Sequence, residues 1–368
     1  MSDAATDRRF MALALSLGAR NLGQAWPNPA VGCVIVKDGR IVGRGWTRPG
    51  GRPHAETVAL AEAGSAAGGA VAYVSLEPCA HHGRTPPCAN ALVDAKLSRV
   101  VTALEDPDPR VAGAGHRYLE EHGIAVTQGV LADAARQSHT GFLSRVTKGR
   151  PFLTLKLALT LDGRIATATG ESRWITGPFA RRRVHAMRLR HDAVLVGGGT
   201  ARADDPTLTV RGLGARVQPV RVVASRRLNL PIKSRLTDTL DQAPLWIVHD
   251  PSAVSEDAVA MWEAAGVKLV PCATGRDSQL DPAALLAALG AAGLTRVFCE
   301  GGGSLAASLL GAGLVDELVV FSAGLAIGAE GRPGIAALGL ERLAEAQRFR
   351  LVSVETAEGD ALHRWRAD

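Results

Sequence analysis

The distribution of apolar and polar positions predicts a chain of alternating helices and strands. Apolar residues recur at helical spacing over 3–19, and two short runs, 31–37 and 40–46, flank an Asp-Gly pair that is typical of a hairpin. The alternation continues to about residue 146, with helices expected at 54–67, 86–96, 115–122 and 132–144 and strands at 71–76, 99–103 and 125–128. This pattern predicts an α/β sandwich that closes before residue 147.

A second α/β series follows the polar, turn-rich segment Thr147-Lys148-Gly149-Arg150-Pro151. We therefore expect one domain at 1–146, a linker at 147–151 and a second domain at 152–368, because 368 residues are long for a single core. Strands are expected at 152–158, 193–196, 220–224, 245–249, 267–270, 296–299 and 317–321, and helices at 178–189, 282–289 and 304–310.

Composition and charge narrow the class of protein. No apolar run approaches the roughly 18 residues of a membrane span, and Met1–Arg9 lacks the apolar core of a signal peptide, so we expect a cytoplasmic protein without membrane contact. Five cysteines in such a chain argue against a disulfide framework. The net charge of +6 comes from 36 Arg and 6 Lys. A basic surface suits nucleic acid or, equally, anionic small molecules, because Arg binds phosphate in bidentate fashion. The chain has no aromatic-basic repeats of the kind that stack single-stranded bases, and we expect no nucleic-acid partner.

Four residues between positions 54 and 88 carry recognisable chemistry. His54, Cys79 and Cys88 offer one imidazole and two thiols, a ligand set that holds zinc with its fourth position open. Glu56 is the proposed proton shuttle between water and a leaving amine. This combination predicts hydrolytic deamination of a pyrimidine or purine ring. His54 and Glu56 converge only at a helix's first turn, because residues two apart do not share a helix face.

The two cysteines are separated by eight residues, where the general deaminase pattern has two. This insertion contains His81, His82 and Arg84. They are either solvated side chains of a surface loop or contacts to the substrate, with Arg84 on an anionic group. A closed structural zinc site with a fourth protein ligand is the other interpretation left open here.

Further segments make the chain resemble the bifunctional deaminase/reductase family of riboflavin biosynthesis. The resemblance covers almost the whole chain, and its segments are 27–32 (Pro-Asn-Pro-Ala-Val-Gly), 53–56, 79–88, 155–158, 161–164, 170–176, 203–206 and 300–303. It implies an N-terminal cytidine-deaminase-like three-layer α/β/α domain followed by a dihydrofolate-reductase-like α/β domain.

The resemblance also implies two reactions. The first is zinc-dependent hydrolytic deamination of 2,5-diamino-6-ribosylamino-4(3H)-pyrimidinone 5′-phosphate to 5-amino-6-(5-phosphoribosylamino)uracil. The second is NADPH-dependent reduction of the ribosyl to the ribityl side chain. Zn²⁺ and NADPH are then the cofactors, and Ala-rich apolar helices favour a homo-oligomer, either a dimer or a tetramer. The alternatives are a tRNA or nucleobase deaminase with a non-catalytic C-terminal domain, and a zinc-stabilised RNA-binding protein.

Individual contacts follow from the same resemblance. Asn28 either orients the pyrimidine or serves as a turn residue between two prolines. The implied cofactor contacts are Ala158, Trp174, Thr200, Asp204, Ser225, Gly302, Gly303, Ser304 and Leu305. The implied substrate contacts are Ser172, Arg188, Leu208, Arg211 and Glu300, with Arg188 and Arg211 on the phosphate.

Two Gly-rich segments, 197–199 and 301–303, follow expected strands. Neither fits G-x-G-x-x-G, which disfavours the usual dinucleotide-binding fold. Glycines between a strand and a helix still let the backbone approach a pyrophosphate, or they form plain tight turns. Ser225-Arg226-Arg227 follows another strand and suits a 2′-phosphate, which predicts NADPH over NADH. Many family members have Asp before this serine, where this chain has Ala224.

Overall fold

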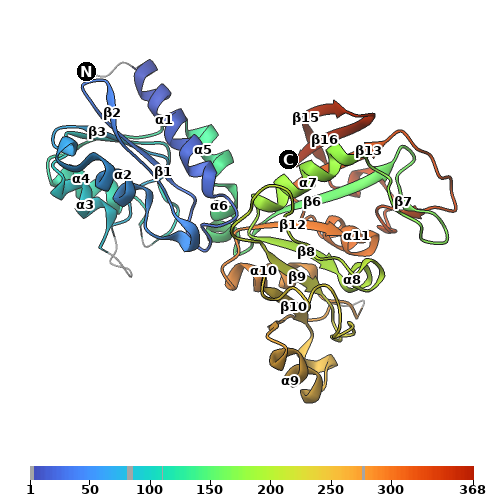
Figure 1. The fold of residues 1–368 in the computed structure, drawn as a ribbon. Coiled ribbons are helices and arrows are strands. Elements are labelled where there is room, and N and C mark those ends of the chain that lie inside the picture. Colours follow the sequence, from blue (N-terminus) through green and yellow to red (C-terminus); the bar gives the residue numbers. More distant parts are fainter. Residues whose placement is uncertain (1–3, 81–85, 110, 276–277) are drawn as a thin grey trace. The chain divides into compact units, whose positions relative to one another are not determined.

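A computed structural model describes residues 4–80, 86–109, 111–275 and 278–368. The chain divides into two compact units, Met1–Gly149 and Arg150–Asp368. Both units are mixed α/β structures, as the alternating pattern predicts (Figure 1). The predicted sites at His81, His82 and Arg84 lie outside the described residues.

The first unit is built on a five-stranded sheet. Its strand order is β2 (Arg40–Trp46), β1 (Gly32–Lys37), β3 (Val71–Val74), β4 (Arg99–Thr102) and β5 (Ala125–Thr127). Strand β1 runs antiparallel to both β2 and β3, whereas β3, β4 and β5 are parallel. The parallel half places the carboxyl ends of β3 and β4 at the same edge of the sheet, where the chain enters the segments that carry polar residues.

Helices cover both faces of this sheet and complete three layers (Figure 1). Helices α1 (Ala4–Gly18) and α5 (Ala132–Ser138) lie on one face, and α2 (Ala55–Ala63), α3 (Cys88–Asp94) and α4 (Ala114–Glu121) lie on the other. Helix α6 (Thr140–Lys148) ends the unit. It runs into the segment expected to be a linker, because the helix continues to the glycine at 149, which takes a positive φ of 68° and ends it.

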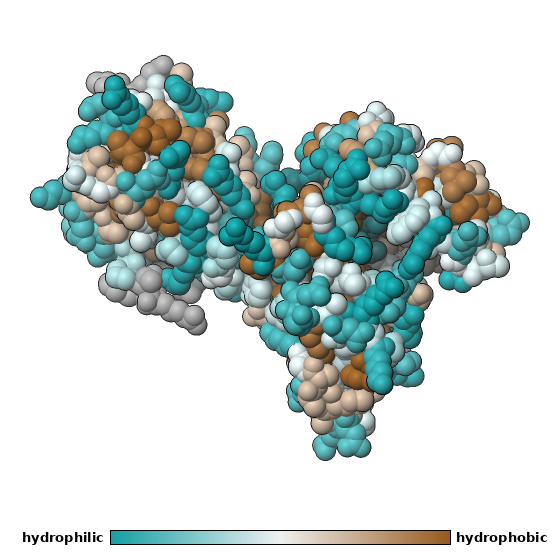
Figure 2. Space-filling model, viewed as in Figure 1, coloured by the Kyte–Doolittle hydropathy of each residue, from teal (hydrophilic) through white to brown (hydrophobic). Residues whose placement is uncertain are grey.

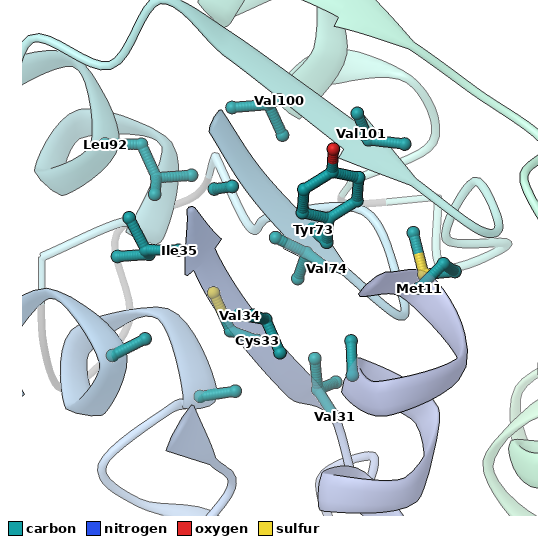
Figure 3. Close-up of a cluster of buried hydrophobic side chains, with 14 of the residues drawn as sticks. Met11, Val31, Cys33, Val34, Ile35, Tyr73, Val74, Leu92, Val100 and Val101 are labelled. Atoms are coloured by element: carbon teal, nitrogen blue, oxygen red, sulfur yellow. The ribbon is translucent and has the colours of Figure 1, made fainter. Parts of the chain in front are cut away.

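The core of the first unit lies between these layers. Figure 3 shows side chains from α1, β1, β3, β4 and α3 meeting around Tyr73 and Val74. The members labelled there are Met11, Val31, Cys33, Val34, Ile35, Tyr73, Val74, Leu92, Val100 and Val101, all of them buried. Few are aromatic, so the core rests on small and branched aliphatic side chains that pack closely.

Two glycines of β2 allow α2 to lie directly on the sheet. A Cβ at Gly45 would fall 2.0 Å from the carbonyl oxygen of Ala55, and one at Gly43 would fall 2.2 Å from that of Ala59. The facing side of α2 carries only alanines, and Ala55, Ala59 and Ala63 are buried. The helix backbone is therefore held at a fixed, short distance from β2, and the position of its first turn is fixed with it.

The second unit contains a nine-stranded sheet. Its order is β11 (Lys268–Pro271), β10 (Leu245–His249), β9 (Val220–Ala224), β8 (Ala193–Gly197), β12 (Arg296–Gly301), β6 (Phe152–Thr160), β13 (Glu317–Ala323), β16 (Asp360–Ala367) and β15 (Phe349–Ala357). The strands from β11 to β13 are parallel, and the hairpin β15–β16 continues the sheet in antiparallel fashion. Two short strands, β7 (Arg164–Ala166) and β14 (Arg332–Pro333), pair separately.

The helices of this unit, in the part that the structure describes, are α7 (Pro178–Leu189), α8 (Gly198–Asp204), α9 (Glu256–Ala264), α10 (Pro282–Ala291) and α11 (Gly303–Gly311). Helix α7 packs its apolar side on β13 and β16, where Ala180 meets Val319, Phe321 and Leu362. Trp262 of α9 fills a second cluster with side chains of β8, β9 and β10. Short 3₁₀ turns occur at Ala19–Asn21, Pro49–Gly51, Gly64–Ala67, Pro251–Ala253 and Leu343–Glu345.

Most expected elements are present within a few residues, and the differences have local causes. The helix expected at 132–144 is two helices that meet at His139, whose φ of −94° and ψ of 10° interrupt the first. Helices α8 and α9 and the strands β7, β14, β15 and β16 were not expected. Hydrophilic side chains predominate on the visible face of each unit, with apolar patches between them (Figure 2). Among the residues that the structure describes, no helix has the length and apolar character needed to cross a membrane.

Candidate active sites

Three predicted metal ligands meet at the edge of the first unit's sheet. His54 immediately precedes α2 in an extended conformation, Cys88 is the first residue of α3, and Cys79 lies in the irregular segment after β3. The His54 Nδ1 atom is 3.7 Å from the Cys79 Sγ and 3.3 Å from the Cys88 Sγ. All three ligand atoms lie within 4.8 Å of one another. The structure thus brings residues 54, 79 and 88 to one point.

The donor set fits zinc in both spacing and charge. In a tetrahedral zinc site the nitrogen and sulfur ligands are about 3.6 Å apart, and the two distances here bracket that value. The hydrogen bond from Cys88 lowers the pKa of Cys79 to about 4, while the same contact and burial raise the pKa of Cys88. Two thiolates this close together require a neighbouring cation, and a divalent metal supplies that charge.

Glu56 lies in the first turn of α2 with only 4% of its surface exposed. Burial raises the pKa of its carboxyl group, and the nearby Cys79 thiolate raises it further against the opposing effect of His54. A raised pKa suits a group that must both accept and return a proton near neutral pH. The structure places Glu56 in the first turn of α2 and His54 just before it. This is the arrangement that His54 and Glu56 need in order to converge.

Asn28 lies against His54. Its Nδ2 donates to the Gly51 carbonyl oxygen at 2.9 Å and is 3.4 Å from the His54 Nε2. Gly51 has a φ of +82°, and a Cβ there would fall 2.7 Å from the Asn28 Nδ2, so only glycine fits beside this amide. The neighbourhood therefore favours Asn28 as a site residue over a simple turn residue, although its contact with a pyrimidine stays a prediction.

Sequence reasoning missed Glu77, which stands two residues before Cys79. Its side chain is fully buried and accepts backbone hydrogen bonds from Asp106, Gly113, Gly115 and His116. Its partners are 29 to 39 positions away along the chain, so no local motif could reveal them.

In the second unit the two Gly-rich segments lie side by side. They follow β8 and β12, which are neighbouring strands, and each opens a helix. A Cβ at Gly302 would come within 2.9 Å of the Thr200 Oγ1, and one at Gly197 would lie 3.8 Å from the Leu305 Cβ. Gly302 has a φ of +87°, which a side chain rarely adopts. The predicted cofactor residues 302–305 and Thr200 therefore share one place at the carboxyl ends of the strands.

Other predicted cofactor residues lie near this edge or on the segments that leave it. Ser225 follows β9, and its Cβ is 3.4 Å from the position that a Cβ on Gly198 would take. Asp204 ends α8, and Ala158 lies in β6. Trp174 is 68% exposed in the segment before α7 and stacks against the guanidinium of Arg181. The high exposure of Trp174 disfavours a role in core packing, the alternative to a cofactor contact.

Two of the predicted substrate residues form a buried ion pair. The Arg188 Nε and Nη2 donate to the two oxygens of Glu300 at 2.5 and 3.0 Å, and its Nη1 donates to the Thr209 carbonyl oxygen at 2.7 Å. Burial alone would raise the pKa of Glu300, but the charge and hydrogen bonds of Arg188 outweigh it and lower the pKa. Since three of its donors are occupied, Arg188 has limited capacity left for a phosphate.

Lys156 of β6, which sequence reasoning missed, is close enough to this pair that both charges act on it. Burial lowers the pKa of its amine, and the charge of Glu300 opposes that effect. Strand alternation could have found it, because Lys156 pairs with Val319 and so shares the face that α7 covers.

The remaining substrate residues are separate from the ion pair. Arg211 is exposed, and its backbone N–H donates to the His185 Nδ1 at 3.2 Å. Leu208 is buried with a φ of +55°. Ser172 is half-buried in the segment before α7. Nothing in these positions contradicts a substrate contact, and these assignments stay predictions.

The two units therefore define a class of protein: a metal-dependent deaminase joined to a domain with two Gly-rich turns at one sheet edge. Family comparison agrees with this division. Residues 4–104 match the cytidine and deoxycytidylate deaminase zinc-binding region, and residues 151–362 match the RibD C-terminal domain. Because both units match, a deaminase with a non-catalytic C-terminal domain is not favoured.

The chain belongs to the RibD family of riboflavin biosynthesis proteins. It is 43% identical to the RibD protein of Escherichia coli over 354 residues, which is 95% of this chain and 96% of that protein. It is 39% identical to the RibD protein of Aquifex aeolicus over 96% of both chains. The structure of Acinetobacter baumannii RibD aligns over 100% of both chains with a TM-score of 0.88 and 37% identity. These findings confirm the predicted family, fold class and pairing of a deaminase with a reductase.

A further solved structure aligns over 99% of both chains, with a TM-score of 0.85 and 33% identity. It is a Thermotoga maritima protein described as a diaminohydroxyphosphoribosylaminopyrimidine deaminase and 5-amino-6-(5-phosphoribosylamino)uracil reductase.

Proposed function

We propose that this chain catalyses two consecutive steps on one riboflavin precursor. The first unit hydrolyses the 2-amino group of 2,5-diamino-6-ribosylamino-4(3H)-pyrimidinone 5′-phosphate. The second unit uses NADPH to reduce the ribosyl group of the resulting 5-amino-6-(5-phosphoribosylamino)uracil to a ribityl chain. The observation that carries this proposal is the meeting of His54, Cys79 and Cys88 beside Glu56, in a chain whose other unit matches the RibD C-terminal domain.

In the deaminase unit, His54, Cys79 and Cys88 are the residues that hold zinc. When bound there, zinc supplies the Lewis acid that activates water for attack on the ring. Glu56 takes a proton from the attacking water and delivers it to the departing amine, which leaves as ammonia. Asn28, held in place by the Gly51 carbonyl, orients the pyrimidine through its amide oxygen.

In the reductase unit, Gly302, Gly303, Ser304 and Leu305 receive the cofactor pyrophosphate on backbone N–H groups at the start of α11. The Arg188–Glu300 pair is positioned to contact the sugar rather than to hold the phosphate with Arg188 alone, because its guanidinium is already bound. Arg211 is exposed and remains the better phosphate contact. Hydride transfer to the sugar depends mainly on positioning, which these contacts supply.

The preference for NADPH is assigned to the segment after β9. Ser225 is buried, Arg226 Nη1 lies 3.8 Å from the Asp250 Oδ2, and Arg227 is exposed. Arg227 is therefore the better contact for a 2′-phosphate. Replacing Arg226 and Arg227 singly with alanine and comparing NADPH with NADH tests this assignment. An unchanged cofactor preference in the Arg227→Ala enzyme would count against it.

We further infer a homo-oligomer in the cytoplasm that acts on small molecules and not on nucleic acid. The edge strand β15 exposes Leu351, Val352 and Val354, and covering these apolar side chains favours a second copy of the chain. The five cysteines are free, which suits a compartment that keeps thiols reduced. Light scattering of the purified protein measures the number of copies, and a monomer at micromolar concentration would refute the first inference.

One experiment tests both activities. The purified protein is given the diamino-pyrimidinone ribosylamine phosphate with and without NADPH. We expect ammonia release without NADPH, followed by NADPH oxidation when the cofactor is added. Glu56→Ala should abolish ammonia release and leave reduction of the separately prepared deaminated intermediate intact. Ammonia release from adenosine in tRNA instead of this substrate would overturn the proposal.

A further inference from the structure

The metal ligand Cys79 lies on a segment with no strand or helix to hold it. Strand β3 ends at Val74, and residues 75–80 have irregular backbone. On the far side, the Cys79 carbonyl oxygen accepts from Ala89 and its Sγ accepts from the Cys88 N–H at 3.3 Å. Those contacts hold Cys79 to the start of α3, and its Sγ also lies 3.7 Å from the His54 Nδ1. The sheet side of the segment needs an anchor of its own, because metal–ligand distances vary by only about 0.2 Å.

Glu77 meets this requirement with an unusual set of bonds. One of its carboxylate oxygens accepts the N–H groups of Asp106 and Gly113, both at 3.0 Å. The other accepts those of Gly115 at 2.8 Å and His116 at 3.3 Å, in the first turn of α4. The Glu77 N–H itself donates to the Leu104 carbonyl oxygen at 2.9 Å. Four donors share two oxygens, so the carboxylate is fully engaged by the backbone.

Within the described part of the chain, the charge of Glu77 is balanced by the dipoles of four backbone N–H groups. Among the residues that the structure describes, the ionisable side chain beside this carboxylate is His116, whose Nδ1 is 3.9 Å from the Glu77 Oε2. Burial lowers the pKa of His116, so its ring is neutral near pH 7. The N–H groups at the start of α4 supply the compensating positive potential. A neutral side chain at position 77 would lose this interaction even if it kept the same shape.

The next residue, Pro78, is fixed by the same group of elements. A Cβ on Gly115 would fall 2.0 Å from the Pro78 carbonyl oxygen, so the backbone of α4 touches the peptide bond that leads into Cys79. The Glu77 side chain and this contact together fasten residues 77–79 to α4 and to the segment after β4. A shift of either would be passed directly to the Cys79 sulfur, one residue further on.

We propose that Glu77 is the positioning residue for Cys79, and that its carboxylate sets the metal affinity of the deaminase site. The inference rests on the proposed zinc site and adds a residue to it that contacts neither metal nor substrate. Residues that orient metal ligands in this way typically change metal affinity or activity 10- to 100-fold when they are mutated. A purely structural carboxylate would instead lower the stability of the unit and leave the affinity of the folded site unchanged.

The test compares Glu77→Gln with Asp7→Asn in the full-length protein. Asp7 is a matched control, because it is a buried carboxylate of the same unit that binds Tyr73 and Arg99 and has no contact with Cys79. Zinc affinity is measured by competition with a chromophoric chelator, and ligand geometry by the absorption spectrum of the Co²⁺-loaded protein. We expect a 10- to 100-fold weaker zinc affinity and an altered Co²⁺ spectrum for Glu77→Gln alone.

Equal zinc affinities in Glu77→Gln and wild type, or an equal loss in Asp7→Asn, would overturn the inference. If Glu77→Gln does not fold, Glu77→Asp decides the question. Aspartate keeps the charge but shortens the side chain by one methylene. We expect Glu77→Asp to weaken zinc binding measurably, though by less than tenfold, and Asp7→Asn to leave zinc binding unchanged. An unchanged affinity in Glu77→Asp would then refute the inference. A wild-type protein that binds no zinc would contradict the proposed function itself, which is a distinguishable result.

Discussion

A buried histidine in the first unit predicts a specific dependence of stability on pH. His139 lies between α5 and α6, is 2% exposed, and its Nε2 is 3.2 Å from both the carbonyl oxygen and the Oγ of Ser75. Burial lowers the pKa of His139 to about 4. Ser75 begins the irregular segment that leads to Cys79, and its Oγ accepts from the Gly32 N–H. His139 therefore contacts the start of the segment that carries Cys79.

The magnitude follows from proton linkage. Above pH 6.5 the imidazole is neutral in both the folded and the unfolded chain, and it adds no pH dependence. As the pH falls from 6.5 towards 4, the unfolded chain binds a proton that the folded chain does not bind. The free energy of unfolding then decreases by about 1.4 kcal/mol per pH unit. Between pH 7.5 and pH 5.0 the loss due to His139 is about 2 kcal/mol.

Urea unfolding of wild type and His139→Gln at these two pH values measures this loss. Glutamine keeps a donor for Ser75 but does not titrate, so comparison with wild type cancels the contributions of all other groups. The transition that the substitution shifts at pH 7.5 identifies the first unit. We expect wild type to be the more stable protein at pH 7.5, and its advantage to shrink by about 2 kcal/mol at pH 5.0. An advantage that stays constant within about 0.5 kcal/mol would refute the reasoning.

Three further predictions concern the two sites. Gly115→Ala forces a Cβ against the Pro78 carbonyl oxygen, so it should cost about 1–3 kcal/mol of stability and leave purified protein with less than one equivalent of zinc by metal analysis. Arg188→Ala leaves the Glu300 carboxylate buried without its partner, so we expect the free energy of unfolding of the second unit, measured in urea, to fall by about 3–5 kcal/mol. The variant should lose the reductase activity and keep the deaminase activity. A strong chelator should abolish ammonia release without affecting NADPH oxidation on the deaminated intermediate, and equal loss of both would contradict independent sites.

The meeting of His54, Cys79 and Cys88, which we propose as the zinc site, could be predicted from sequence because its chemistry is local. His54 and Glu56 stand at the start of one helix, and Cys79 and Cys88 flank one insertion, so residue type and spacing carry the signal. The Glu77 contacts could not be predicted, since its four donors are backbone N–H groups that any residue provides. Only the folded chain places those groups around one carboxylate.

In the second unit, too, features that depend on local sequence could be predicted, and features that depend on distant residues could not. Buried parallel strands such as 220–224 and 245–249 are predominantly apolar, with Arg221 and His249 as their polar members, and the apolar pattern predicts them at their observed bounds. The strand β15 was missed because most of its side chains are exposed and mix Arg350 and Glu355 with apolar residues. The pairing of Arg188 with Glu300 was also missed, since 112 positions separate them and each resembles a solvated charge in sequence.

The close contact between β2 and α2 has a consequence for mutational tolerance. Ordinary contact distances begin near 3.4 Å, so a methyl group at Gly43 or Gly45 must displace α2 by more than 1 Å. Because His54 directly precedes Ala55, that displacement acts on the end of α2 where His54 lies, although neither glycine is itself a proposed ligand. Surveys of natural variants that consider only the side chains around the zinc would overlook both positions. Loss of deamination with an intact set of ligands is the expected phenotype of such variants.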